Sequence, residues 1–245
     1  MELKLEKLSF DWRGKTVLDG ISATVPSSGL TCLLGANGAG KTTLLRILSG
    51  DLKPTSGRYF IDSRNAATLC RKELSHYFSV IPQNTSVPLY ITVKEMVGLG
   101  RFQSRAALWW HLTTEDRAVV DECLALCRMT AFKNRRIDEL SGGEQRRAWL
   151  AFGLAPDKNF LILDETLDGM DLLTKRAFFQ MLKGIALKNR GILMASHDLE
   201  MVAEFADHAI VLSAGMIIFE GVPDSNMSRF FALSGDAYSG KPACA

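Results

Sequence analysis

Hydrophobic and polar residues alternate along residues 4–10 and 16–25, and residues 58–61 form a further strand-like segment after a Pro-Thr-Ser-Gly turn at 54–57. Alternation of this kind is typical of strands that bury one face. Uninterrupted apolar runs lie at residues 30–34, 160–163 and 191–195, as expected for parallel strands that are covered on both faces. The pattern therefore predicts a parallel sheet with an antiparallel addition built from the N-terminal segments.

Helical periodicity appears in the middle and last thirds of the chain. An N-capping sequence at residues 113–116 precedes Val120, Cys123, Leu124 and Cys127, which recur at helical spacing. Residues 172–187 lie between two predicted parallel strands and are expected to form their crossover helix. We therefore predict an α/β fold with an inserted α-helical segment, and a loosely ordered tail at about residues 224–245.

A glycine-rich segment with the pattern G-x-x-x-x-G-K-T joins the apolar run at 30–34 to a predicted helix at 44–48. This is a phosphate-binding loop in the strand–loop–helix setting that the motif requires. Its glycines let the backbone approach phosphate oxygens, Lys41 adds a charge for the β- and γ-phosphates, and the Thr42 hydroxyl is placed to ligate Mg²⁺. The predicted nucleotide-binding residues here are Gly35, Ala36, Asn37, Gly38, Ala39, Gly40, Lys41, Thr42 and Thr43.

Reactive side chains follow the two later apolar runs. Asp164 and Glu165 end the run that begins at residue 160, and His197 follows the run that ends at residue 195. Because open α/β sheets bind ligands at the C-terminal ends of their strands, we expect these side chains to face the phosphate loop. Asp164 is predicted to hold Mg²⁺ through water, Glu165 to act as general base, and His197 to reach the γ-phosphate.

The sequence Leu-Ser-Gly-Gly-Glu-Gln at residues 140–145 opens another segment of good helix composition. Ser141 and the amides of Gly142 and Gly143 are expected to form a second anion site at that helix start. Taken alone, the motif favours a helix cap without a ligand over an anion site. A single nucleotide at residues 35–43 would leave this second site unused.

Composition changes this picture little. The 245 residues are 47% hydrophobic and 23% charged, with a formal net charge of +2, which gives no support for binding to nucleic acid. No apolar run approaches the ~18–20 residues that span a bilayer, and residues 1–7 are expected to form a strand instead of a signal peptide. Five cysteines without C-x-x-C spacing indicate buried apolar residues in a reducing compartment, the cytosol.

In the order of its motifs the chain resembles the ATP-binding subunit of an ATP-binding cassette (ABC) transporter over nearly its whole length. Residues 35–43 match the Walker A loop, 140–145 the signature motif, and 160–165 the Walker B strand with its catalytic glutamate. The resemblance implies a single ABC ATPase domain with a P-loop NTPase (RecA-like) core. About 1–83 and 146–223 would form the β subdomain and this core, and about 84–145 the helical subdomain.

The resemblance also implies roles for residues outside these motifs. Gln83 matches the Q-loop glutamine, which contacts the metal and the catalytic site, and Asp171 matches the D-loop aspartate. His197 matches the switch histidine. Trp12 lies where the family has an aromatic ring that stacks on adenine, although an aromatic residue on such a strand is more commonly part of the core.

Two copies pack head to tail in this family. The resemblance therefore implies that Ser141, Gly142, Gly143 and Glu144 of one copy close over ATP held by the other copy. ATP with Mg²⁺ would join the dimer and hydrolysis would release it, so that energy is delivered as a population shift.

The segment after Glu165 departs from the family pattern D-E-P-T-x-G-L-D. Thr166 stands in place of the proline that fixes the turn, and Leu167 in place of the threonine. All of the acidic residues are present, so we expect hydrolysis to survive this change. The orientation of Asp171 and the communication between the two sites are the properties that it affects.

Residues 92–101 resemble the T-V-x-E-x-V-x-L-G-R run of importer ATPases for iron chelates, haem or cobalamin, and residues 115–122 also look like them. The resemblance implies a peripheral subunit on the cytoplasmic face of the membrane. Its partners would be a permease and a periplasmic or extracellular substrate-binding protein. An exporter or lipid-trafficking ATPase, and a soluble assembly factor, stay open as alternatives.

Trp109 and Trp110 are adjacent, so on a helix both cannot face the core well. One of them is a candidate anchor for a partner, and packing of both within the helical subdomain stays open as the alternative.

Overall fold

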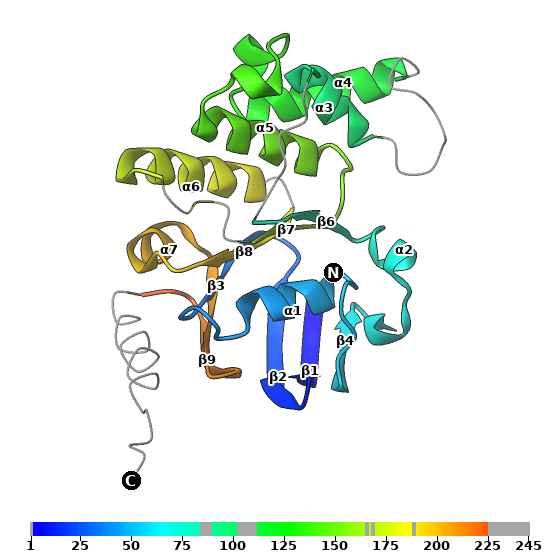
Figure 1. Cartoon of the computed structure of the whole chain (residues 1–245), viewed down its shortest axis with the longest axis vertical. Helices are drawn as coiled ribbons and strands as arrows, with labels where there is room; N and C mark the ends of the chain where they lie inside the picture. The colour runs from blue at the N-terminus through cyan, green and yellow to red at the C-terminus, as the bar shows by residue number, and fades with distance from the viewer. Residues whose placement is uncertain are drawn as a thin grey trace.

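The computed structural model describes residues 2–83, 90–101, 112–164, 167, 170–187 and 190–224. Two β-sheets and a group of helices make up this part of the chain (Figure 1). The strands are β1 (Glu2–Trp12), β2 (Lys15–Pro26), β3 (Gly29–Leu34), β4 (Ser56–Ile61), β5 (Arg64–Asn65), β6 (Phe78–Ile81), β7 (Phe160–Asp164), β8 (Gly191–Ser196), β9 (His208–Ser213) and β10 (Met216–Gly221). The α-helices are α1 (Lys41–Leu48), α2 (Arg71–Leu74), α3 (Val93–Leu99), α4 (Thr114–Leu126), α5 (Gly142–Leu154), α6 (Leu172–Ala186) and α7 (Leu199–Phe205).

The central sheet has six strands in the order β10-β9-β3-β8-β7-β6. All neighbouring pairs from β9 to β6 are parallel, and β10 adds an antiparallel edge. Parallel strands have their C-terminal ends at one edge of the sheet. The segments that follow β3, β6, β7 and β8 therefore leave the sheet on the same side.

Alternate residues of the central strands face two separate hydrophobic clusters. In β7, Leu161 and Leu163 belong to a cluster shared with α5, α6 and α7, while Phe160 and Ile162 belong to a cluster shared with α1 and the antiparallel sheet. Burial on both faces explains why these strands are uninterrupted apolar runs in the sequence. The predicted parallel core is thus confirmed.

The antiparallel sheet has the order β2-β1-β4-β5 and lies on the α1 side of the central sheet (Figure 1). It contains the three N-terminal strand segments that the sequence predicts. Strands β1 and β2 run beyond the predicted segments at both ends, to Trp12 and Pro26. Tyr59 is buried in β4, and its hydroxyl donates a hydrogen bond to the carbonyl oxygen of Ile47 in α1.

Helices α3, α4 and α5 lie together on the opposite side of the molecule from the antiparallel sheet (Figure 1). Helix α5 contacts α3, α4 and β6, so it joins this helical group to the central sheet. Cys123 and Cys127 of α4 lie within the shared core cluster, as expected for small apolar residues. Burial raises the pKa of the Cys123 thiol to about 11.

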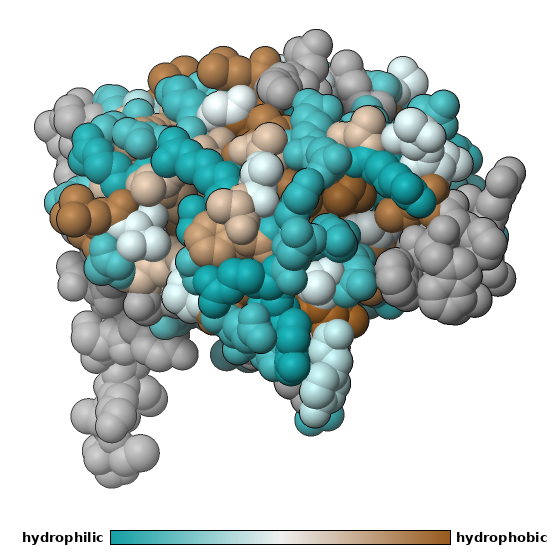
Figure 2. All heavy atoms as spheres, turned by 90° about the horizontal axis from the view of Figure 1, so that it is seen from above, coloured by the Kyte–Doolittle hydropathy of each residue, from teal (hydrophilic) through white to brown (hydrophobic). Residues whose placement is uncertain are grey.

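The outer surface of the helical group is mixed in character. Seen from that end, hydrophilic residues cover much of the surface, and hydrophobic atoms form separate small patches between them (Figure 2). Among the described residues, no helix combines the length and the apolar composition needed to cross a membrane. Trp109, Trp110 and the tail from residue 225 lie outside the described residues.

Candidate active site

The phosphate loop connects β3 to α1 in very little space. Gly40, the N-cap of α1, has φ 103°, and a Cβ there would lie 2.6 Å from Leu18 Cδ2. A Cβ on Gly35, with φ 152°, would lie 2.4 Å from the carbonyl oxygen of Leu212. Both positions require glycine, because the backbone conformation disfavours a side chain and the neighbouring strands leave no room for one.

Lys41, the first residue of α1, is only 4% exposed. Its Nζ donates hydrogen bonds to the carbonyl oxygens of Gly35 at 2.8 Å and Ala36 at 3.2 Å. The ammonium group is therefore held across the loop by the loop's own backbone. A lysine in this position brings its charge to the place where the helix start and the loop amides favour an anion.

Thr42 and Asp164 meet across the sheet edge. Thr42 Oγ1 donates a hydrogen bond to Asp164 Oδ1 at 3.1 Å, although the two residues are 122 positions apart in the sequence. Asp164 is buried at the end of β7. A hydroxyl in the first turn of the phosphate loop helix and a carboxylate at the end of the neighbouring strand β7 are the kind of oxygen donors that Mg²⁺ prefers. The residues present therefore fit the predicted metal.

His197 follows β8, which lies between β3 and β7 in the central sheet. In the register of the sheet, Ser196 lies beside Leu34 of β3, and Ala195 lies beside Asp164 of β7. His197 follows Ser196 directly and is exposed at the sheet edge. The predicted convergence of the phosphate loop, Asp164 and the His197 segment on one edge is therefore present in the backbone.

Gln83 joins the same edge from the outermost parallel strand. It lies two residues after β6, in which Ile81 is beside Leu163 of β7. A hollow opens at the phosphate loop, and Gln83 is one of the residues that line it. The other residues that line this hollow are Val17, Asn37, Gly38, Gly40, Lys41, Thr42 and Thr43.

The predicted general base, Glu165, lies outside the described residues, as do Thr166, Asp168 and Gly169. Leu167 is described and is 7% exposed, within the core cluster that covers the helical side of the sheet. The departure from the family pattern at this position therefore puts an apolar side chain into the core.

Ser141 begins α5 with a reciprocal capping arrangement. The Glu144 amide donates to Ser141 Oγ at 3.4 Å, and the Ser141 amide and hydroxyl both donate to Glu144 Oε2 at 2.8 Å. These hydrogen bonds hold the pKa of Glu144 below its usual value. The structure thus contains the helix cap that the sequence predicts as an alternative to an anion site. The cap leaves the amides of Gly142 and Gly143 at the helix start.

Asp171 caps α6 in a similar way. Its carboxylate accepts hydrogen bonds from the Thr174 hydroxyl at 2.6 Å and the Thr174 amide at 2.9 Å, and these lower its pKa. A hollow lies between the starts of α5 and α6. Ser141, Gly142, Gly143, Glu144 and Asp171 all line it. The signature motif and the D-loop aspartate are therefore brought together, away from the phosphate loop hollow.

Trp12 ends β1 and is 54% exposed. Its ring centroid is 6.2 Å from that of Phe10, which is buried. Because β1 and β2 form a hairpin, Trp12 lies on the strand pair that supplies Val17 to the phosphate loop hollow. The structure contradicts a core role for Trp12, because more than half of its surface is exposed.

One polar contact at this edge has no counterpart in the sequence prediction. Lys175 Nζ donates to Asp198 Oδ2 at 3.2 Å and so joins α6 to the segment that carries His197. Asp198 also caps α7 by accepting a hydrogen bond from the Met201 amide. The sequence signal was slight: Asp198 follows the candidate histidine, and Lys175 is four residues after Asp171.

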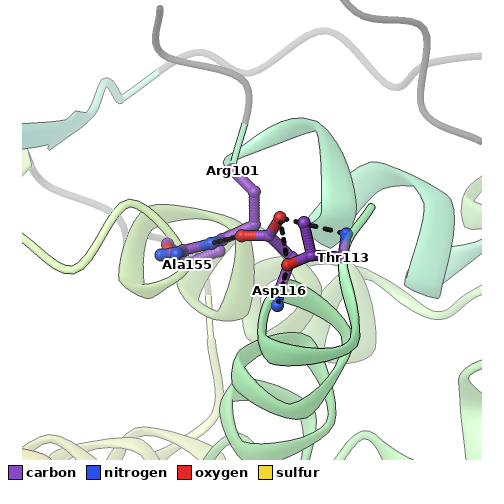
Figure 3. A network of polar contacts seen from close by, with 4 residues as sticks. All are labelled: Arg101, Thr113, Asp116 and Ala155. Carbon is purple, nitrogen blue, oxygen red and sulfur yellow. Dashed lines mark hydrogen bonds and ion pairs between the residues drawn. The ribbon is translucent and has the colours of Figure 1, made fainter. Parts of the chain in front are cut away.

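The helical group is braced by Arg101, which follows α3. Its Nε donates to Asp116 Oδ1 at 2.8 Å, and one terminal nitrogen donates to the carbonyl oxygen of Ala155 at 2.7 Å (Figure 3). Asp116 also accepts hydrogen bonds from Thr113, the N-cap of α4. The two sequence stretches that resemble importer ATPases, 92–101 and 115–122, therefore meet at this network.

Comparison with known proteins identifies the class. The family described as ABC transporter matches residues 18–168, and this chain belongs to that family. It is an ABC ATPase with the P-loop NTPase fold, an ATPase coupled to transport. The family, the fold and the enzymatic activity predicted from the sequence are thereby confirmed.

Individual relatives sharpen the comparison. The petrobactin import ATP-binding protein YclP of Bacillus subtilis is 30% identical over 223 residues, which cover 91% of this chain and 87% of the relative. The hemin import ATP-binding protein HmuV of Rhizobium meliloti is 31% identical over 229 residues, 90% of this chain and 86% of the relative. A dimeric post-hydrolysis structure of the cassette MJ0796, bound to ADP and phosphate, is 25% identical with a TM-score of 0.76 and covers 91% of this chain and 99% of that one.

Proposed function

We propose that this chain is the ATP-hydrolysing subunit of an importer for an iron chelate, haem or cobalamin. The support is twofold. Relatives are named as import ATP-binding proteins for petrobactin, hemin and cobalamin. In addition, the importer-like stretches at 92–101 and 115–122 are joined by the Arg101–Asp116 ion pair.

Within one chain, the phosphate loop binds ATP. Lys41 and the loop amides hold the β- and γ-phosphates, and Trp12 stacks on the adenine. Thr42 and Asp164, with Gln83 nearby, hold Mg²⁺, which when bound neutralises phosphate charge. Glu165 orients and deprotonates the attacking water, and His197 holds the γ-phosphate. The observation that supports the roles of Lys41, Thr42, Gln83, Asp164 and His197 is the single sheet edge, at which the ends of β3, β6, β7 and β8 meet.

The second anion site calls for a second copy of the chain. The hollow between α5 and α6 contains the signature residues and Asp171, and the phosphate loop hollow is lined by other residues. We propose that two copies pack head to tail, so that Ser141, Gly142, Gly143 and Glu144 of one copy close over the nucleotide of the other. The dimeric relative with ADP and phosphate supports this arrangement.

The working protein is then a peripheral complex on the cytoplasmic face of the membrane. Its partners are a transmembrane permease and a periplasmic or extracellular protein that delivers the cargo. Hydrolysis shifts the population of the closed dimer, and the permease converts that shift into movement of the cargo.

Co-purification tests the partner. A tagged chain is expressed with its neighbouring genes, and the complex is extracted in detergent. We expect a polytopic membrane protein to co-purify, and the ATPase rate of the reconstituted complex to rise on addition of a cargo-loaded binding protein. Recovery of only a soluble partner would contradict the transport proposal. Stimulation by cargo from the cytoplasmic side alone would indicate export.

A further inference from the structure

The segment that carries His197 is held at both of its ends. Before it, Ser196 is buried at the end of β8, and its Oγ accepts a hydrogen bond from the Asp198 amide at 3.1 Å. After it, the Asp198 carboxylate accepts hydrogen bonds from the Met201 amide at 3.3 Å and from Lys175 Nζ at 3.2 Å. The position of His197 therefore depends on where Asp198 lies.

Lys175 fixes Asp198 to a different element, the first turn of α6. The side chains of Lys175 and Asp198 are only 18% and 20% exposed, so the pair is partly shielded from water. A small hollow at this point is lined by Leu167, Phe179 and Met194 together with Lys175, His197 and Asp198. An ion pair in such surroundings is screened less by salt than one on the open surface.

The same turn of α6 carries Asp171. The Lys175 amide donates to the Asp171 carbonyl oxygen at 3.0 Å, as expected for residues four apart in a helix. Asp171 caps that turn through Thr174, so its backbone and Lys175 belong to one hydrogen-bonded unit. A short path of hydrogen bonds thus runs from Asp171 through Lys175 to Asp198, the residue next to His197.

We propose that Lys175 is a positioning residue for hydrolysis, which holds the His197 segment against α6 through Asp198. The inference rests on the proposed function, because it assumes that His197 acts on the γ-phosphate and that Asp171 faces the second copy. Under this proposal, engagement of Asp171 by the second copy sets the position of His197. Lys175 itself touches neither nucleotide nor water in the reaction.

Steady-state ATPase kinetics of the full chain test the proposal. We expect Lys175→Gln to lower kcat about five- to tenfold with little change in the KM for ATP, because the residue orients a group that acts in the transition state. Lys175→Arg keeps the charge and should restore most of the rate. Asp198→Asn keeps a good helix cap but loses the charge, and should resemble Lys175→Gln.

Arg176 provides a matched control. It is the next residue of α6 and also forms an ion pair with α7, through Glu204, but it is not among the residues that line the hollow beside His197. Arg176→Gln should therefore leave kcat unchanged. Thermal unfolding of each variant shows whether the fold is retained, and Asp198→Asn serves if Lys175→Gln does not fold.

A double substitution separates the inference from the proposed function. If Lys175 acts through His197, Lys175→Gln should lower kcat no further in a His197→Ala background. Additive effects, or a normal kcat for Lys175→Gln beside a low kcat for His197→Ala, would overturn the positioning role and leave the proposed function intact. A normal kcat for His197→Ala itself would overturn the proposed role of His197, and the inference with it.

Discussion

Trp12 is a single exposed aromatic residue whose setting gives it a use. Its neighbours Phe10 and Leu18 fill the core below the hairpin, whereas more than half of the Trp12 surface is exposed. A large exposed ring on the hairpin that supplies Val17 to the phosphate loop hollow could stack on a base, since that contact would bury apolar area.

We expect Trp12→Ala to weaken ATP binding about tenfold, since base stacking on an aromatic side chain contributes about 1–3 kcal/mol. Trp12→Phe should keep most of the affinity. Tyr90 is exposed as well but stacks with Arg136, so Tyr90→Ala is the matched control and should bind ATP normally. Calorimetric titration with ATP measures all three variants, and wild-type affinity for Trp12→Ala would rule out the stacking role.

Individual residues also show what the sequence could and could not predict. The phosphate loop, Asp164 and His197 were predictable because each follows an apolar strand in a fixed order. The Lys175–Asp198 pair was not, because it depends on how α6 packs against the end of β8. The sequence shows that Leu167 departs from the family pattern, but only the fold shows that its side chain is buried in the core.

At the scale of elements, short polar motifs determine where the helices begin. Thr92 and Glu95 cap α3, Thr113 and Asp116 cap α4, and Ser141 and Glu144 cap α5. The importer-like residues Thr92 and Glu95 thus have a local structural task as well. The sequence predicted the cap of α4 but not β9 or β10, whose pairing at the sheet edge depends on distant contacts.

Arg101 joins three of these elements, and its loss should destabilise the helical group. We expect Arg101→Met to lower the free energy of unfolding at pH 7 by about 1–2 kcal/mol, because it removes two charge-assisted hydrogen bonds that are partly exposed. Arg117 is an exposed neighbour of Asp116 on α4, so Arg117→Met is the control and should change stability little. Urea denaturation measures both.

The stabilisation by the Arg101–Asp116 ion pair should depend on pH. Arg101 holds the pKa of Asp116 below its usual value of 3.8 in the folded chain. The stabilisation is therefore complete above the unfolded pKa and is lost as the pH falls through the lower folded pKa. We expect the difference between wild type and Arg101→Met to shrink below about pH 4. A difference that stays constant down to pH 3 would contradict the ion pair.

At the scale of the whole molecule, two cores lie on the two faces of one sheet. The α1 side carries the antiparallel sheet and Trp12, and the helical side carries the starts of α5 and α6. The signature motif and the phosphate loop therefore line separate hollows of the same chain. The order of the motifs predicted both halves of the proposed site, but their separation within one chain follows from the topology.

Self-association should therefore depend on ATP. We expect Glu165→Gln to elute as a dimer in gel filtration with ATP and Mg²⁺, and as a monomer without them, because nucleotide stays bound when hydrolysis is blocked. The double variant Glu165→Gln with Lys41→Ala is the control and should remain monomeric. A monomer under both conditions would contradict ATP-dependent dimerisation of the isolated chain.

Because of the cap at Ser141, closing of the proposed dimer would exchange one hydrogen-bond acceptor of the Ser141 hydroxyl for another. A serine hydroxyl has one proton to donate, and here Glu144 accepts it at 2.8 Å. In the proposed dimer, a phosphate of the second copy would replace the Glu144 carboxylate as acceptor of the hydrogen bond from the Ser141 hydroxyl, and the carboxylate would accept that bond again when the phosphate leaves. The contact then contributes only the difference between two anionic acceptors. Such a contact can discriminate between nucleotide states without holding the two copies together irreversibly.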